Sequence, residues 1–358
     1  MGLDLAPRLS ERTVTAGALR SKEHESVAPF RPLPFLRNPH LQTILGRASW
    51  GRELFPSVHH LIGLEDGDKL AVVVSTPAGW EPEDRTAVLV HGLCGCYQSA
   101  YVSRMAGRLF GLGLRVVRVN LRGCGSGRGL ARHPYHSGRS EDVRQVLTWL
   151  NLQWPESPVA LLGYSLGGNI VLKMAGEDGH VPTGSLDSVI AVSAPIDLLA
   201  CSQLIEQPRN RLYDRHFVKL LIMDVRERQR FFPDLPDVSL PPQPTLRQFD
   251  DTYTAPRSGF RDAVDYYERA SSGPLIGRIE VPTLLLTARD DPFIAVDPFE
   301  RVPDRRHIEV HITDHGGHLG FLGFTSNPWK FRWMDDFLVD WILRRQGHIH
   351  PSRVDLCD

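Results

Sequence analysis

The sequence has no long hydrophobic run. No segment approaches the roughly 18 uncharged apolar residues that a membrane-spanning helix needs. The first residues carry Asp4, Arg8, Glu11 and Arg12, and they lack the apolar centre of a secretory signal. We therefore expect a cytoplasmic protein without a transmembrane anchor.

An excess of charge of either sign is also missing. Lysine and arginine number 41 against 42 aspartate and glutamate residues, and the formal net charge is -1. A protein that binds nucleic acid usually carries a basic excess that complements the phosphates. The composition therefore argues against nucleic acid as a partner.

Cysteine is scarce and irregularly spaced. The five cysteines contain no C-x-x-C pair and lie at Cys94, Cys96, Cys124, Cys201 and Cys357. An odd, scattered set predicts neither a disulfide framework nor a zinc site, and it fits a reducing compartment. We expect no metal and no other cofactor.

Patterns of strand and helix alternate along much of the chain. An apolar fraction of 42% in 358 residues is enough for a substantial core. After a hairpin pattern at 58–74, continuous apolar runs typical of buried parallel strands alternate with helical stripes. The alternation predicts an α/β fold, with a mostly parallel twisted sheet flanked by helices. The expected strands are 87–90, 114–119, 158–162, 188–193, 282–287 and 307–312; the expected helices are 99–112, 140–150, 170–175 and 329–345, the last with Phe331, Met334, Phe337, Leu338 and Ile342 buried.

The alternation stops between residues 197 and 270. This stretch contains a charged helical segment and a proline-rich segment before a strand pattern returns at 282. An insertion that leaves the sheet after a strand lies over the strand ends, where ligands bind in such sheets. The predicted organisation is an N-terminal arm and packing segment (1–56), a core in two parts (57–196 and 271–346), a helical cap inserted before the last two strands (197–270) and a tail (347–358).

A glycine-rich segment follows the strand expected at 114–119. Residues 122–129 invite comparison with a nucleotide-binding loop. They lack the G-K-[ST] ending, and their glycines do not have the G-x-G-x-x-G spacing that opens a helix. We interpret the segment as a structural turn.

The pattern G-x-S-x-G occurs at residues 163–167, between an apolar strand and a helix-prone segment. Gly163 and Gly167 lack side chains where strand and helix pass too closely for a Cβ, so Ser165 stands clear on a sharp turn. A chance match in an ordinary glycine-lined turn is the alternative, and the strand-turn-helix context disfavours it. Ser165 is therefore a candidate nucleophile.

A serine nucleophile needs a histidine base and an acid that orients the histidine. With this type of elbow, the serine, the acid and the histidine follow one another along the chain. Asp290 or Asp291, and then His315 or His318, follow expected strands in that order, and Asp197 is a third acid candidate. Metal-assisted hydrolysis is poorly supported, because the two histidines lack an H-E-x-x-H context.

Further motifs occur between about residues 30 and 345. In chain order they lie at 38–43, 122–124, 135–138, 249–251, 290–293 and 315–321. With the elbow and the loop at 91–93, they resemble the YheT-like branch of the α/β-hydrolase family, which includes bacterial hydrolases and animal membrane-anchored lipases. The resemblance implies cleavage of carboxylic esters with Ser165, Asp291 and His318 as the catalytic triad. Asp291 matches the family acid when the Asp-Pro step sets the register, and Asp290 then caps the turn.

Two backbone N–H groups are expected to form an oxyanion hole. They belong to Leu166, directly after the serine, and to Leu93, in the loop after the strand at 87–90. The family often has an acidic or polar residue where Cys94 stands, so this departure is expected to change the polarity of the pocket and leave the triad intact. His40, in the 38–43 motif, is interpreted as structural.

The resulting hypothesis is a serine hydrolase that cleaves a small-molecule acyl ester or a lipid through an acyl-enzyme. Two alternatives stay open at this point. One is a non-catalytic protein that binds a lipid-like ligand in the same pocket, although an intact serine, acid and histidine set argues against it. The other is an acyltransferase, in which an alcohol replaces water.

Overall fold

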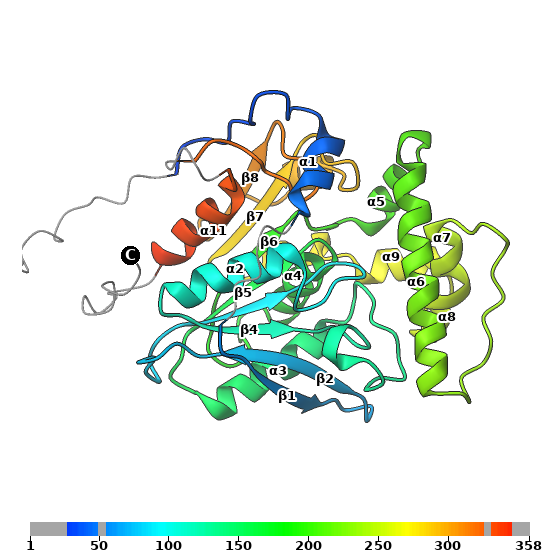
Figure 1. Cartoon of the computed structure of the whole chain (residues 1–358), viewed down its shortest axis with the longest axis horizontal. Helices are drawn as coiled ribbons and strands as arrows, with labels where there is room; N and C mark the ends of the chain where they lie inside the picture. Colours follow the sequence, from blue (N-terminus) through cyan, green and yellow to red (C-terminus); the bar gives the residue numbers. More distant parts are fainter. Residues whose placement is uncertain (1–26, 49–54, 326–330, 346–358) are drawn as a thin grey trace, which may run out of the picture.

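The computed structural model describes residues 27–48, 55–325 and 331–345 (Figure 1). Most of the expected N-terminal arm and the whole expected tail at 347–358 lie outside these residues. None of the described helices has the length and apolarity that crossing a bilayer requires.

An eight-stranded sheet forms the centre of the fold, with the strand order β1-β2-β4-β3-β5-β6-β7-β8. The hairpin β1-β2 and the pairing of β2 with β4 are antiparallel, whereas the later neighbours are parallel. The strands are β1 (Val58–Gly63), β2 (Lys69–Ser75), β3 (Thr86–Val90), β4 (Arg115–Val119), β5 (Val159–Tyr164), β6 (Leu186–Val192), β7 (Thr283–Ala288) and β8 (Ile308–Thr313).

Helices cover both faces of this sheet (Figure 1). Successive residues of β5 show why its sequence is apolar without alternation: Leu161 packs into the core with α3 and α4, and Leu162 packs into the core with α2 and α11. The predicted α/β fold with a mostly parallel sheet is confirmed. The flanking helices are α2 (Ala100–Gly111), α3 (Ser140–Gln153), α4 (Leu166–Asp178) and α11 (Trp333–Leu343).

Between β6 and β7 the chain leaves the sheet and forms a group of helices at one side of the molecule (Figure 1). The longest is α6 (Arg211–Phe231), whose residues Val218, Leu221 and Val225 are buried at helical spacing. The helical insertion therefore precedes the last two strands, as predicted. The group also contains α5 (Leu198–Ile205), α7 (Leu246–Phe249), α8 (Ala255–Arg257) and α9 (Ala263–Ala270), and α1 (Pro39–Gly46) lies beside it.

The C-terminal helix is shorter than predicted. It begins at Trp333, so Phe331 precedes it and is 40% exposed rather than buried. Backbone pairing is the reason, since Leu322 and Arg332 form an isolated β-bridge and the Gly323 N–H donates to the carbonyl of Phe331. Residues 329 and 330 lie outside the described residues. The other predicted positions are buried, namely Met334, Phe337, Leu338 and Ile342.

Candidate active site

Ser165 occupies a sharp turn between β5 and α4. Its φ is 52°, in the left-handed region that residues with a side chain rarely adopt. A Cβ on Gly163 would lie 2.3 Å from the carbonyl oxygen of Gly167, and a Cβ on Gly167 would lie 2.5 Å from that of His91. Both positions therefore require glycine for the strand and the helix to approach so closely.

A chain of hydrogen-bonding contacts starts at Ser165. Its Oγ lies 3.0 Å from Nε2 of His318, and Nδ1 of His318 lies 2.9 Å from Oδ2 of Asp291. Asp291 follows β7 and His318 follows β8, so neighbouring strands bring these side chains together. The arrangement allows His318 to take the serine proton while Asp291 orients the ring.

The two adjacent aspartates have different contacts. Oδ1 of Asp291 accepts the backbone N–H groups of Phe293 at 2.8 Å and Ile294 at 3.1 Å, and the carboxylate is buried. Oδ1 of Asp290 accepts the N–H of Gly317 at 2.9 Å, and burial raises the pKa of Asp290 above its ordinary value. Asp290 therefore holds the backbone of the histidine loop, whereas Asp291 contacts the histidine itself.

The remaining acid and base candidates lie elsewhere. Nδ1 of His315 lies 3.3 Å from Oδ2 of Asp290, and the His315 side chain is partly exposed. Asp197 is the N-cap of α5, where its side chain accepts the N–H of Ala200 at 2.9 Å. In the described structure, neither His315 nor Asp197 contacts Ser165.

The loop after β3 lies against the serine and is held by two tyrosines. A Cβ on Gly92 would lie 2.9 Å from the Cβ of Ser165. The hydroxyl of Tyr101 accepts the N–H of Gly92 at 2.9 Å, and the hydroxyl of Tyr135 accepts the N–H of Cys94 at 3.0 Å. The sequence did not indicate this role for either tyrosine, because both contacts join separate segments of the chain.

Two backbone N–H groups at this loop and elbow are unpaired. The N–H of Leu93, between the two held positions, donates to no acceptor among the described residues. Leu166 is the first residue of α4, and the N–H groups in the first turn of a helix have no acceptor within the helix. Both groups are therefore available to an anionic oxygen near Ser165.

Helix α1 supports the histidine loop. The N–H of His318 donates to Oγ1 of Thr43 at 2.9 Å, and Gln42 binds both backbone groups of Leu322. The sequence marks 38–43 only as a motif, because a contact between residues 275 positions apart leaves no local pattern. His40, on the same helix, has its Nδ1 3.1 Å from the hydroxyl of Tyr213.

Ser165 and His318 line a cavity of about 950 Å³. Its walls come from α1, from the loop after β3 and from the helices between β6 and β7. A largely apolar cavity of this size suits an acyl chain or another lipid-like group. The apolar lining includes Leu93, Leu166, Leu198, Phe217, Leu221 and Phe293.

Two titratable groups of the lining have shifted pKa values. Burial raises the pKa of Asp250 to about 6, and the hydroxyl of Tyr267 donates to its Oδ2 at 2.8 Å. Burial also raises the pKa of Cys94 to about 12, so its thiol stays protonated at neutral pH. Cys94 therefore presents a neutral side chain to the cavity.

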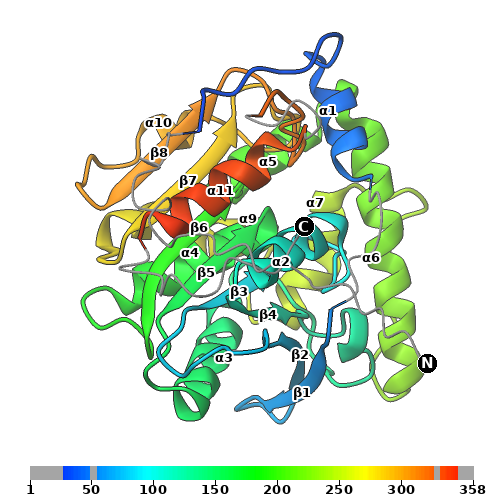
Figure 2. The ribbon, with the colours of Figure 1, turned by 60° about the vertical axis from the view of Figure 1, so that its left-hand side comes forward.

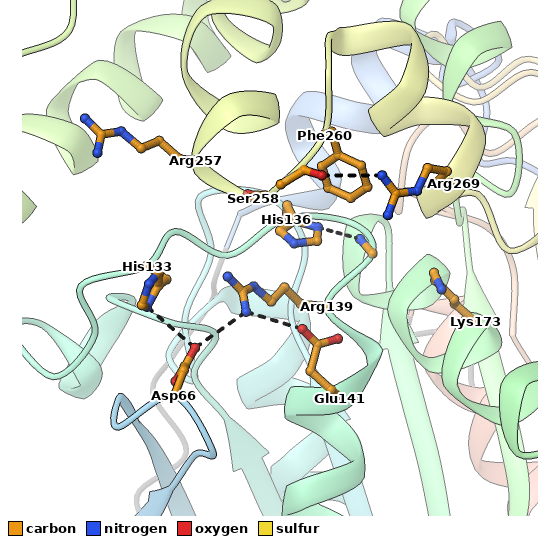
Figure 3. A pocket seen from close by; sticks show the side chains of 12 residues that line it. Asp66, His133, His136, Arg139, Glu141, Lys173, Arg257, Ser258, Phe260 and Arg269 are labelled. Atoms are coloured by element: carbon orange, nitrogen blue, oxygen red, sulfur yellow. Dashed lines mark hydrogen bonds and ion pairs between the residues drawn. The ribbon is translucent and has the colours of Figure 1, made fainter.

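A second pocket, of about 710 Å³, shares His136 with the first. Figure 3 shows several of its charged side chains in contact with one another. Nη1 of Arg139 lies 3.3 Å from Glu141 and 3.8 Å from Asp66, and Nδ1 of His133 lies 3.5 Å from Asp66. Burial lowers the pKa of His136 well below its ordinary value, which keeps the ring neutral. The second pocket is therefore polar, in contrast to the apolar cavity at Ser165.

The glycine-rich segment at 122–129 forms a turn next to a buried ion cluster. Three of its glycines have positive φ, and the guanidinium of Arg122 contacts Asp66, Asp68 and Asp142. Asp66, Asp68 and His133 lie close enough to share a cation, but Arg122 already contacts both carboxylates. The segment is therefore a turn whose arginine, Arg122, is held in ion pairs with three aspartates.

Known proteins share sequence and fold with this chain. The chain matches the model of the Alpha/beta hydrolase family over residues 87–330. It is 32% identical to the putative esterase YheT of Escherichia coli K12, over 90% of this chain and 95% of that protein. It is also 28% identical to medium-chain fatty acid ethyl ester synthase/esterase 2 of Saccharomyces cerevisiae, over 70% of this chain and 61% of the yeast protein.

A solved structure shares the fold. An esterase of Pyrococcus furiosus aligns with a TM-score of 0.51 and 17% identity, over 89% of this chain and 95% of that one. The sequence match to YheT extends the likeness beyond the fold alone. The chain therefore belongs to the alpha/beta hydrolase family, in the branch that contains YheT.

Proposed function

We propose that this protein is a serine hydrolase that cleaves carboxylic esters with apolar acyl groups. The proposal rests on the contact chain from Ser165 through His318 to Asp291, with distances of 3.0 and 2.9 Å, at the wall of an apolar cavity. Two relatives whose names include the word esterase support the same class of reaction.

In the proposed mechanism, Oγ of Ser165 attacks the ester carbonyl while Nε2 of His318 takes its proton. Asp291 stabilises the imidazolium, and the N–H groups of Leu93 and Leu166 bind the oxyanion. His318 then protonates the leaving alcohol, which yields an acyl-enzyme on Ser165. A water molecule then gives a proton to His318 and attacks this intermediate. His318 returns the proton to Oγ of Ser165 as the acid leaves, which restores the serine.

Residues 197–270 act in this proposal as a cap over the acyl group. Helices of the segment supply Leu198, Ile205, Phe217 and Leu221 to the cavity wall. An apolar wall favours uncharged acyl chains, because a polar group buried there loses its hydrogen bonds to water. The lining therefore supports an ester of a fatty acid, or another lipid, as the substrate.

Acyl transfer is a second candidate function, because the name of the yeast relative joins ester synthase with esterase. In that reaction an alcohol in the cavity takes the acyl group from Ser165 in place of water. Product analysis with added ethanol separates the two reactions. Hydrolysis gives the free acid at every ethanol concentration, whereas transfer gives a rising fraction of the ethyl ester.

A panel of esters graded by acyl length tests the proposal, with the wild type compared with Ser165→Ala. We expect Ser165→Ala to lower turnover by roughly 10³-fold or more, with the circular dichroism spectrum unchanged. A fluorophosphonate probe should modify the wild type at Ser165 and leave the variant unlabelled. A wild type that neither turns over esters nor takes the label would instead indicate a ligand-binding protein on this fold.

A further inference from the structure

The outward face of α6 is cationic. Its exposed positions include five basic residues spaced four or seven residues apart, which places them along one side of the helix. The buried residues and part of the cavity lining lie on other sides of the helix. The five are Arg211, Arg215, Lys219, Arg226 and Arg230.

The carboxylates of α6 do not balance these charges. Asp214 is buried and accepts the N–H of Leu246, Asp224 is partly buried, and Glu227 lies 3.2 Å from Arg128. None of the five basic residues forms an ion pair with another residue that the structure describes. The basic face therefore carries a local excess of positive charge, although the formal net charge of the chain is -1.

Exposed apolar side chains lie beside this face. Leu212 on α6 is 79% exposed and Ile44 on α1 is 57% exposed, and both also line the cavity, so they form part of its rim. Leu41 and Leu45 on α1 are exposed as well. Solvent exposure of four large apolar side chains on these two helices, two of them at the cavity opening, is typical of a contact surface.

Helices α1 and α6 lie side by side at this opening (Figures 1 and 2). The His40 and Tyr213 rings stack with their centroids 5.6 Å apart, and Nδ1 of His40 lies 3.1 Å from the tyrosine hydroxyl. Leu212 is exposed between Arg211 and Arg215, so the apolar rim adjoins the cations of α6 at the start of that helix.

We propose that this surface, formed by α1 and the exposed face of α6, docks the protein on an anionic lipid membrane. The inference rests on the proposed function, because an enzyme for apolar acyl esters finds its substrate in a lipid phase. Basic side chains attract anionic headgroups, and exposed apolar side chains enter the interface between headgroups and acyl chains. The rim then faces the lipid, so an ester passes into the cavity without crossing water.

The balance of charged and apolar groups on this surface determines which kind of membrane it would bind. A few exposed apolar side chains bind lipid weakly by themselves, so the cations of α6 must supply much of the attraction. Salt screens such an attraction over a distance of about 10 Å at an ionic strength of 0.1 M. Binding should therefore require anionic lipid and weaken as the ionic strength rises.

Vesicle flotation with the full chain tests the proposal. We expect binding to vesicles of phosphatidylcholine mixed with phosphatidylglycerol, and little binding to vesicles of phosphatidylcholine alone. Raising the NaCl concentration roughly tenfold should release the bound protein, since the Debye length shortens to a few ångströms near 1 M.

The variant Arg211→Glu/Arg215→Glu/Lys219→Glu reverses three cations on the half of α6 nearest the rim. None of the three lines the cavity. Because each basic residue near an anionic surface contributes separately, we expect the triple variant to lose binding by at least about tenfold. Hydrolysis of a short, water-soluble ester should stay at the wild-type rate, which shows that the variant is folded.

A matched control reverses three exposed arginines just before β8, in the variant Arg301→Glu/Arg305→Glu/Arg306→Glu. It makes the same change in net charge. Figure 2 shows this part of the chain, next to α10 (Asp297–Glu300), on the opposite side of the molecule from α6. The control should bind the mixed vesicles as the wild type does.

Several results would overturn the docking surface: no flotation of the wild type, equal losses in the two triple variants, or binding to a DNA duplex as tight as to vesicles. Flotation requires no turnover, so it separates the two proposals. If the protein hydrolyses esters but does not bind vesicles, only the proposed docking surface is contradicted. If the protein binds vesicles but is not labelled by the fluorophosphonate, the proposed function is contradicted.

Discussion

The backbone N–H of His318 donates to Oγ1 of Thr43 over 2.9 Å, so a helix near the start of the described chain holds the candidate base near its end. Thr43 is buried, and its hydroxyl donates to the carbonyl of Pro39 at 2.7 Å, which fixes the side chain. The contact holds the loop backbone and leaves the imidazole free to reach Ser165 and Asp291. Thr43 is therefore a positioning residue in the proposed mechanism.

We expect Thr43→Val to lower kcat/KM by roughly 10- to 100-fold, because a displaced base loses its alignment with the nucleophile. Valine keeps the shape of the side chain but leaves the His318 N–H without its acceptor, which also costs about 1–3 kcal/mol of stability. Thr43→Ser retains the hydroxyl and should stay near the wild-type rate. Steady-state kinetics with one short ester measures both variants, and equal rates for the two would argue against a positioning role.

Substituting each of the paired aspartates separates their roles. Asp291→Asn removes the carboxylate that accepts from Nδ1 of His318, favours the wrong tautomer and should lower kcat by roughly 10³- to 10⁴-fold. Asp290→Asn keeps an oxygen that accepts the Gly317 N–H, so its loss should stay below about 10-fold. The measurement is kcat for both variants at one pH, with unfolding temperatures as the fold control. The reverse order of effects would assign the acid to Asp290.

The turn that carries the candidate nucleophile was predictable from the sequence, because its residues lie close together in the chain. Gly163, Ser165 and Gly167 lie within five residues of one another, and the steric conflicts that require glycine arise inside that turn and at the adjoining strand. The choice of Asp291 as candidate acid and His318 as candidate base depended on chain order and on a family motif. Spacing alone did not separate them from Asp290 and His315, because each pair lies on one loop and differs only in the direction of its side chains.

The parts that the sequence did not reveal are contacts between distant segments. Thr43 reaches His318 across 275 positions, and the Tyr135 hydroxyl reaches Cys94 across 41. Neither contact produces a periodic pattern, so both side chains looked like ordinary polar or aromatic residues. The prediction that Phe331 is a buried helical residue was wrong because a local pattern was misleading. The helical spacing extends back to Phe331, but the backbone there pairs with Gly323.

The pKa of Asp250 leads to a prediction about stability and pH. Burial raises this pKa from 3.8 to about 6, so between these values the folded protein holds a proton that the unfolded chain has released. Stability therefore falls as pH rises from about 4 to 6, and the full penalty for burying the carboxylate remains above pH 6. Asn is neutral at every pH and still accepts a hydrogen bond from the Tyr267 hydroxyl.

We expect Asp250→Asn to raise the free energy of unfolding by on the order of 2 kcal/mol at pH 8. The gain should shrink by about half near pH 5, because the wild-type carboxyl is then largely protonated in the folded protein. Urea unfolding of both proteins at the two pH values measures the difference. A gain of the same size at both values would contradict the assignment of the effect to Asp250 ionisation.

The loop that carries Leu93 provides a test of the proposed oxyanion hole. The Tyr135 hydroxyl accepts the Cys94 N–H at 3.0 Å, directly after Leu93, and so helps to aim the unpaired Leu93 N–H. Tyr135→Phe removes one oxygen and no other atom of the side chain. The Cys94 N–H then lacks its acceptor, and the loop loses one of the two hydroxyl contacts that hold it beside Ser165.

We expect Tyr135→Phe to lower kcat by about 10-fold with KM nearly unchanged, which is less than the roughly 10²- to 10³-fold cost of removing an oxyanion donor outright. The loss falls on kcat because an oxyanion exists only after the serine attacks, so a misaimed donor weakens the transition state more than the bound ester. Tyr97→Phe deletes the same atom from a nearby tyrosine whose hydroxyl makes no hydrogen bond to any described residue, and it should leave kcat unchanged. A rise in KM with constant kcat in Tyr135→Phe would instead indicate that the Tyr135 hydroxyl contributes to binding of the ester in the ground state. That result would argue against the Leu93 N–H as an oxyanion donor.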